Sequence, residues 1–305
     1  MDSSNESQGI FDRIASVLKR VPGGALLFAI LPALVLGYMG WFHYGAEHLD
    51  RALYALKKEN LSLTKQPDWI RSNIVDEVFE QGMLDQITLL DPTSNKKIAH
   101  AFEANHWVKS TSHVTKAFGG KVSVDVIYRR PLAMVRVPPS ESEELAATGG
   151  PAKDHFLPVD ADGVVLPTSD FSPNDVLKYF LIIAKDARAS SGMTGMQFGD
   201  TRITDALKLC SFLDEKSVGI KQIDVVPTMG SGGSSPWLLT LTSADGQRTI
   251  VWGHAPGTES RQESSAEAKL ERMQEWLTVN ADNPARLMLD LRDAHSASQV
   301  SLLRP

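Results

Sequence analysis

Three histidines, His100, His106 and His113, stand close enough in the sequence to suggest a metal site. Neutral imidazole is a common zinc ligand, but the ligands of one ion must converge on one point. Spacings of six and seven residues, across an expected boundary between a helix and a strand, place these rings on different faces. We therefore expect solvated histidines and no bound metal.

The other candidate groups also favour structural roles. Asp160-Ala-Asp-Gly163 resembles half of a calcium-binding loop, but the downstream oxygen ligands and the bidentate glutamate are missing. The same residues make a good hairpin turn. Asp290 and Asp293 are too isolated to form the carboxylate pair of a glycosidase. Cys210 lies on an apolar helical stripe, which is the usual place of an inert core thiol.

No recognised catalytic motif occurs in the sequence. Gly-x-Ser-x-Gly, His-Glu-x-x-His and a Walker-type phosphate loop are absent, and the Gly/Ser run at 230–235 is better explained by loop flexibility than by anion binding. We expect a protein that is not an enzyme and that needs no cofactor. A membrane-tethered hydrolase of unfamiliar type stays open, because polar groups with shifted pKa values that cluster in a cleft leave no linear signature.

The composition is that of an ordinary globular protein. Lys and Arg number 31 against 37 Asp and Glu, so the net charge is −6, which argues against a general nucleic-acid binder. Hydrophobic residues make up 42% of the chain and charged residues 22%. The single cysteine excludes an internal disulfide framework and a cysteine-based metal centre. A length of 305 residues allows about two folded domains.

An uncharged apolar segment near the N-terminus predicts a membrane span. No Asp, Glu, Lys or Arg occurs from Val21 to Ala46, and aromatic residues gather at its C-terminal end. We expect a transmembrane helix at 21–44 behind a cytoplasmic tail at 1–20. The alternative is a cleaved signal peptide, which the long leading region and the missing cleavage site disfavour. The basic pair Lys19-Arg20 favours an extracytoplasmic position for everything after this single span.

The residues after the span predict a small mixed unit. Charges and leucines suggest a juxtamembrane helix at 45–66, which Pro67 ends. Helical spacing follows at 69–82, and a second helix begins at Pro92. Alternating side chains then predict strands at 114–118, 121–128 and 132–137. The expected order is helix, helix, strand, strand, strand over 67–137, with a short strand before the first helix as an option.

The remaining chain predicts a second, β-rich domain at 155–305, after a flexible linker at 138–154. Its strands are expected to form a mostly antiparallel sheet with flanking helices, so the fold class is α+β. Two Asp-Gly turns predict hairpins. The expected strands and helices of this domain are 156–159, 164–166, 203–213 (helix), 220–226, 236–241, 249–252, 266–277 (helix) and 286–291.

Several short motifs, spread over most of the chain, resemble those of the FtsQ/DivIB-type bacterial cell-division proteins. The helix that ends in Trp107-Val108 is similar to one of that family, and Arg129-Arg-Pro-Leu-Ala133 resembles its Arg-Pro-x-Ala strand end. Further resemblance lies in the hairpin Phe156–Leu166, in Gly253, in the helix with Lys269-Leu-Glu-Arg272, and in the strand Leu289-Asp-Leu-Arg292. Departures are the long stretch before the first helix, the missing Leu-Pro-x-x-x-Gly after the hairpin, and Asp293 where an aromatic residue often stands.

The resemblance implies a fold and a function. Residues 67–137 would be a POTRA domain and residues 155–305 the family's β domain. The protein would be a non-enzymatic scaffold of the septation complex in the bacterial inner membrane. It would link small division membrane proteins of the FtsB/FtsL type to septal peptidoglycan synthesis. The alternative is a POTRA-bearing component of a secretion or outer-membrane assembly system, which predicts tandem POTRA units or a β-barrel.

The same resemblance implies where a partner binds. In that family the segment after Asp-Leu-Arg is the sheet edge that takes the partner's strand. The role is carried onto Arg292, Asp293, His295, Val300 and Leu302. A frayed tail that closes the sheet is an equally open interpretation of this segment.

Overall fold

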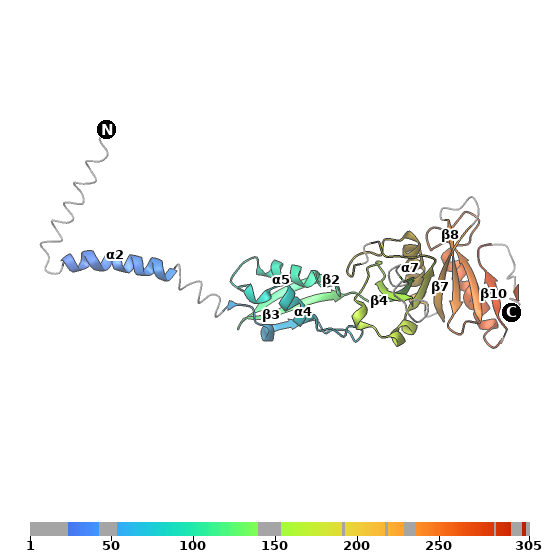
Figure 1. Ribbon diagram of the computed structural model, residues 1–305, viewed down its shortest axis with the longest axis horizontal. Helices are drawn as coiled ribbons and strands as arrows, with labels where there is room; N and C mark the ends of the chain where they lie inside the picture. Colours follow the sequence, from blue (N-terminus) through green and yellow to red (C-terminus); the bar gives the residue numbers. More distant parts are fainter. Residues whose placement is uncertain are drawn as a thin grey trace, which may run out of the picture.

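The computed structural model describes residues 24–42, 54–139, 154–190, 193–216, 219–228, 236–283, 285–293 and 301–302. After the first helix, these residues build two units that lie side by side along the long axis of the molecule (Figure 1). The first unit carries a three-stranded sheet and the second an eight-stranded sheet.

The N-terminal apolar segment forms a helix, α2 (Gly24–Gly40), of 17 residues. At a rise of about 1.5 Å per residue this helix is shorter than the roughly 30 Å of a bilayer's hydrocarbon core. Among the described residues, no helix has both the length and the apolar character needed to cross a membrane. The expected transmembrane helix at 21–44 is therefore wrong. An uncharged run in the sequence measures only composition, whereas a span also needs enough residues in one helix.

The first unit packs two helices on one face of its sheet. Asn73 caps α4 by accepting a hydrogen bond from the backbone N–H of Asp76 at 3.3 Å. Ile98 and Phe102 of α5 are fully buried and pack with the inward side chains of β3. The elements in chain order are β1 (Leu61–Leu63), α4 (Ile74–Gln81), α5 (Ser94–Glu103), β2 (Val108–Ala117) and β3 (Lys121–Tyr128), with 3-10 turns at Lys58–Asn60 and Leu84–Gln86.

The strand order of this sheet is β1-β3-β2, with β1 parallel and β2 antiparallel to β3. The optional strand before the first helix is therefore present as β1. β1 lies inside the segment for which a helix at 45–66 was expected, so the helix does not extend to residue 66: Tyr54 is helical, but a 3-10 turn at Lys58–Asn60 and β1 follow. Residues 45–53 lie outside the described residues.

The strand expected to complete the first sheet belongs to the second one. β4 (Pro131–Val137) pairs with β5 and β6 in the eight-stranded sheet, so the expected order with three consecutive strands in the first unit is wrong. The first unit is instead strand, helix, helix, strand, strand. Alternation of side chains identifies a strand, but it does not identify the sheet that the strand joins.

The second unit is a mixed sheet in the order β11-β10-β9-β8-β7-β6-β4-β5. The pairs β4/β6, β6/β7 and β9/β10 are parallel, so the expected mostly antiparallel sheet is corrected to a mixed one. Two of these parallel pairs follow from crossover helices, since α7 connects β6 to β7 and α8 connects β9 to β10. The elements are β4, β5 (His155–Asp160), β6 (Phe180–Ala184), α7 (Thr201–Asp214), β7 (Ile220–Pro227), β8 (Trp237–Ser243), β9 (Arg248–Gly253), α8 (Ala266–Val279), β10 (Leu287–Asp290) and β11 (Ser301–Leu302), with 3-10 turns at Thr168–Asp170 and Pro173–Lys178.

Trp252 of β9 shows that both crossover helices cover the same face of this sheet. Its ring lies 6.1 Å from that of Phe212 on α7, measured between ring centroids. The ammonium of Lys269 on α8 lies 5.5 Å from the same ring. Side chains from both helices and from seven strands of the sheet form one large apolar core beneath them.

The two units are joined by polar and aromatic contacts. The ring of Trp107 in the first unit lies against that of Phe171 in the second, tilted by 35° and with 6.0 Å between ring centroids. Arg129 follows β3 and donates to Asp160 at the end of β5, with 2.7 Å between Nη1 and Oδ2. Arg71 reaches Asp175 in the same way at 2.7 Å. The orientation of the units is thus held by side chains far apart in the sequence.

Replacing Asp160 tests how much this junction contributes. Asp160 is 3% exposed, and its Oδ1 also accepts hydrogen bonds from the backbone N–H groups of Asp162 and Val164. We expect Asp160→Ala to lower the free energy of unfolding by about 3 kcal/mol, because it leaves Arg129 and two turn donors without their acceptor. Urea denaturation followed by tryptophan fluorescence measures the change.

Asp162→Ala is the matched control, since Asp162 is 47% exposed and contacts Lys109 and Arg129 only from the surface. We expect it to change the free energy of unfolding by less than about 1 kcal/mol. An equal decrease in the free energy of unfolding of the two variants would contradict the structural role assigned to Asp160.

Candidate partner-binding edge

Strand β10 lies near one end of the eight-stranded sheet, and its outer side is the candidate edge. β9 covers the inner side through a parallel ladder from Leu287 to Asp290. On the outer side, β11 pairs antiparallel with only two residues, Leu287↔Leu302 and Met288↔Ser301. Among the described residues, no strand pairs with Leu289 or Asp290 on the outer side.

The backbone of β10 presents alternate residues to the two sides. The N–H groups of Leu287 and Leu291 bind the carbonyl oxygens of Gln247 and Val251, so the odd-numbered residues face β9. The even-numbered residues therefore direct their N–H and C=O groups outward. Asp290 is the last residue of the strand and the one whose outward backbone groups β11 does not reach.

The side chains of β10 alternate as expected. Leu287, Leu289 and Leu291 are at most 1% exposed, and Met288 and Asp290 are half-buried. The strand is confirmed, with its bounds at Leu287–Asp290 inside the predicted 286–291.

Asp290 and Arg292 form a turn that ends the strand. Asp290 accepts hydrogen bonds from the backbone N–H of Arg292 at 3.0 Å and from its guanidinium at 2.6–3.1 Å. Burial raises the pKa of Asp290, but the hydrogen bonds and charge of Arg292 outweigh this effect, so the pKa lies below its ordinary value. Arg272 of α8 binds the backbone oxygen of Asp293 at 3.1 Å and holds the chain after the turn.

A buried carboxylate, Glu263, organises the corner beside this turn. It is 4% exposed and accepts from the backbone N–H groups of His254 and Ser260 and contacts the His254 ring at 2.9 Å. A Cβ at Gly253, where φ is +99°, would overlap the carboxylate of Glu263 and approach Arg292 Cγ to 3.2 Å. Gly253 is therefore required both by its backbone conformation and by this close packing.

Lys269 is the second charge of this corner. It is 0% exposed, and its Nζ lies 3.7 Å from Glu263 Oε2 without a hydrogen-bond partner among the described residues. Desolvation lowers the pKa of Lys269, while the charges of Glu263, Glu259 and Asp290 oppose that shift. A lysine buried in this way is held by ion pairing and by the ring of Trp252.

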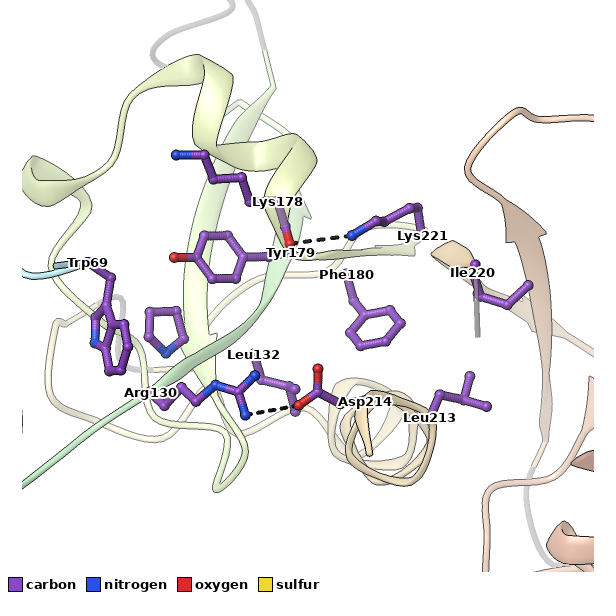
Figure 2. A pocket seen from close by; sticks show the side chains of 12 residues that line it. Trp69, Arg130, Leu132, Lys178, Tyr179, Phe180, Leu213, Asp214, Ile220 and Lys221 are labelled. Carbon is purple, nitrogen blue, oxygen red and sulfur yellow. Dashed lines mark hydrogen bonds and ion pairs between the residues drawn. The ribbon is translucent and has the colours of Figure 1, made fainter. Parts of the chain in front are cut away.

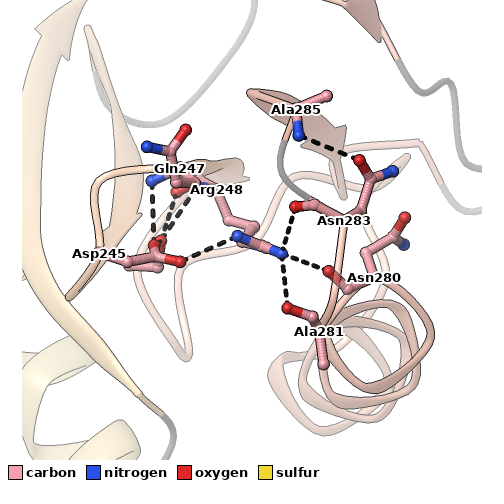
Figure 3. A network of polar contacts seen from close by, with 8 residues as sticks. Asp245, Gln247, Arg248, Asn280, Ala281, Asn283 and Ala285 are labelled. Atoms are coloured by element: carbon pink, nitrogen blue, oxygen red, sulfur yellow. Dashed lines mark hydrogen bonds and ion pairs between the residues drawn. The ribbon is translucent and has the colours of Figure 1, made fainter.

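A buried arginine, Arg248, fixes the chain that enters β10 (Figure 3). It is 5% exposed and donates to the backbone oxygens of Asn280, Ala281 and Asn283, the last two at 2.9 Å. Its other terminal nitrogen binds Asp245 at 2.9 Å. These oxygens lie at and beyond the end of α8, where helix carbonyls have no partner within the helix. Arg248 thereby joins the β8–β9 hairpin to the loop before β10.

The five residues named by the resemblance are only partly described. Arg292 and Asp293 lie at the turn after β10, and Leu302 belongs to β11. His295 and Val300 lie outside the described residues.

Reasoning from the sequence missed three residues of this site, Arg248, His254 and Glu263. Single charged residues in turns and loops carry no periodic signal that would identify them.

The histidines, the cysteine and the aspartate turn that the sequence analysis considered as possible sites all lie away from the outer side of β10. His100 contacts Glu103 at 3.6 Å on α5, and the ring of His106 lies against Gly195. Within the described ranges, no group of three or more His, Cys, Asp or Glu is placed to hold a metal ion. Cys210 is fully buried on α7, and burial raises the pKa of its thiol. The turn at Asp160 is confirmed, since Oδ1 of Asp160 accepts hydrogen bonds from the backbone N–H groups of Asp162 and Val164.

No protein family matches the sequence, and no curated protein matches it either.

Replacing Arg248 tests the support of the edge. We expect Arg248→Met to lower the free energy of unfolding by about 3 kcal/mol, because three backbone oxygens lose a charged donor in a buried place. Chemical denaturation measures the loss. Arg286→Met, an exposed arginine just before β10, is the control and should change stability by less than about 0.5 kcal/mol. An Arg248→Met variant as stable as this control would contradict the role.

The Asp290–Arg292 turn predicts a pH dependence. Because the pKa of Asp290 is lowered in the fold, its contribution to stability is present above the unfolded pKa of about 3.9 and is lost as the pH falls through the folded pKa. Arg292→Gln should therefore be less stable than the wild type at pH 7, and the gap should narrow below about pH 4. Melting temperatures across this range measure the gap, with Arg286→Gln as control. A gap that stays constant down to acid pH would refute the assignment.

Proposed function

We propose that this protein is a non-enzymatic scaffold of the bacterial cell-division complex. It binds small division proteins of the FtsB/FtsL type and links them to septal peptidoglycan synthesis. The observation that carries the proposal is the incomplete outer side of β10, where the outward backbone groups of Asp290 have no strand partner among the described residues. A partner strand that adds there gains main-chain hydrogen bonds from an existing sheet.

The motifs that suggested the family support the proposal by their positions. Gly253, Lys269 and the Leu289–Arg292 strand end lie far apart in the sequence but meet around Glu263. Each of these residues shapes the corner at which β10 ends.

The chemistry of the corner supports a binding role. Its buried charged groups are engaged with one another and with backbone groups, as Glu263 is with His254 and Ser260. In the proposed function the corner supplies rigidity, and the backbone of β10 supplies recognition. Attachment to a membrane is no part of the proposal.

Localisation in growing cells tests the proposed role. A fluorescent fusion of the full chain should gather at midcell before constriction, and FtsB/FtsL-type proteins of the same cell should co-purify with it. A uniform distribution through the whole cell cycle would contradict the division role.

A proline at position 290 tests the edge itself. Asp290→Pro removes the outward N–H without touching the ladder to β9, whereas Asp290→Ala removes only the side chain. We expect Asp290→Pro to lose at least about tenfold in partner capture relative to Asp290→Ala, because one main-chain hydrogen bond of the added strand is missing and the ring crowds the edge. The two variants should melt within a few degrees of each other. Equal partner capture by both variants would exclude this edge.

A further inference from the structure

A second candidate binding site lies at the junction of the two units, away from β10. It is a pocket of about 340 Å³ at the N-terminal ends of the parallel strands β4, β6 and β7. The C-terminal end of α7 forms one wall, and Trp69 of the first unit forms another (Figure 2). Neither the proposed strand addition nor the corner around Glu263 uses this pocket.

The pocket is locally positive in a chain whose net charge is −6. Asp175 is shared by two cations, at 2.7 Å from Arg71 and 2.6 Å from Lys178. The charged residues that line the pocket are Arg130, Lys178, Lys221 and Asp214, so three positive groups minus one negative group give a local charge of +2.

Two of the cations retain capacity for an incoming anion. Arg130 contacts Asp214 through Nη1 at 3.0 Å, and a guanidinium carries five N–H donors, so further donors remain. Lys221 contacts the backbone oxygen of Lys178 at 3.4 Å and has no carboxylate partner among the described residues. Figure 2 shows both contacts at the edge of the pocket. An ammonium that binds only a distant carbonyl gains from a carboxylate.

The floor between these cations is apolar. Leu132 and Leu213 are buried, and in the view of Figure 2 the ring of Tyr179 lies between Trp69 and Phe180. Burial raises the pKa of the Tyr179 hydroxyl, so this group is a hydrogen-bond donor over the physiological range. The pocket thus offers an apolar floor with cationic donors around it.

We propose that this pocket binds an acidic peptide segment of a partner protein, with an apolar side chain on the floor and flanking carboxylates on Arg130 and Lys221. A small-molecule ligand is disfavoured, because such sites bury most of their ligand whereas the side chains of Arg130 and Lys178 are each 67% exposed. Exposed cations around an apolar floor are the pattern of a protein-interaction rim, where charge sets specificity and association rate.

Because the walls come from both units, a bound peptide would contact Trp69 of the first unit and Phe180 of the second at once. The inference goes beyond the proposed division role and does not depend on it. Its test uses purified protein, so failure here leaves the β10 edge standing.

The test uses a fluorescein-labelled peptide Glu-Glu-Trp-Glu-Glu and its counterpart with Gln in place of every Glu. Fluorescence anisotropy with the purified full chain should show binding of the acidic peptide only. Raising the salt concentration from about 50 mM to about 500 mM should weaken the affinity for the acidic peptide several-fold, since the contacts are exposed ion pairs. Lys221→Glu should weaken binding at least about tenfold, because it replaces an attraction by a repulsion.

Lys185→Glu is the matched control, since Lys185 is exposed just beyond the opposite end of β6 and the change in net charge is the same. It should keep the affinity within about twofold of the wild type. Circular dichroism confirms that both variants fold. No binding of the acidic peptide, equal binding of the Gln peptide, or equal losses in the two variants would each overturn the proposal.

Discussion

A buried carboxylate needs hydrogen-bond donors or positive charges around it. In this protein the groups that surround Glu263 fix the structure at one end of the large sheet. Taking an ionised side chain out of water costs several kcal/mol unless charges and donors surround it. Two backbone N–H groups, the ring of His254 and the ammonium of Lys269 do so here. This requirement holds the loop between β9 and α8 against the turn after β10.

Arg248 is a second buried charge, and its hydrogen-bond partners fix the chain at the start of β10. Its guanidinium collects backbone oxygens at and beyond the end of α8, so the chain enters β10 from a held position. β10 is thus tied at its start by Arg248 and at its end by the Asp290–Arg292 turn. Within the part of the chain that the structure describes, β10 is held at both ends but paired over only part of its outer side, which makes it a template for another strand.

The position of β4 makes the two units dependent on each other. It follows β3 after two residues, yet it pairs in the other sheet, so the chain crosses the junction without a linker. Arg129, just before β4, links the two units at this point by donating a hydrogen bond to Asp160. The pocket around Lys221 and Arg130 is a consequence of this arrangement, because the N-terminal ends of three parallel strands meet the first unit there.

Local periodicity determined most individual elements. Alternation in Lys121–Tyr128 and the apolar stripe of Ile203–Leu213 predicted β3 and α7, because side-chain direction repeats every two residues in a strand and about 3.6 in a helix. The turn at Asp160 was also predictable, since its geometry depends on adjacent residues. The alternation of Leu287, Leu289 and Leu291 predicted β10 for the same reason.

Tertiary structure alone decided which strands pair and which charges meet. β4 carries the pattern of any strand, and its partners β5 and β6 are chosen by long-range packing. The parallel pairing of β9 with β10 likewise depends on where α8 packs. Glu263 and Arg248 show no pattern in the sequence, because their partners lie on other elements of the fold. Periodicity is a property of neighbours along the chain, whereas pairing and charge compensation are properties of neighbours in space.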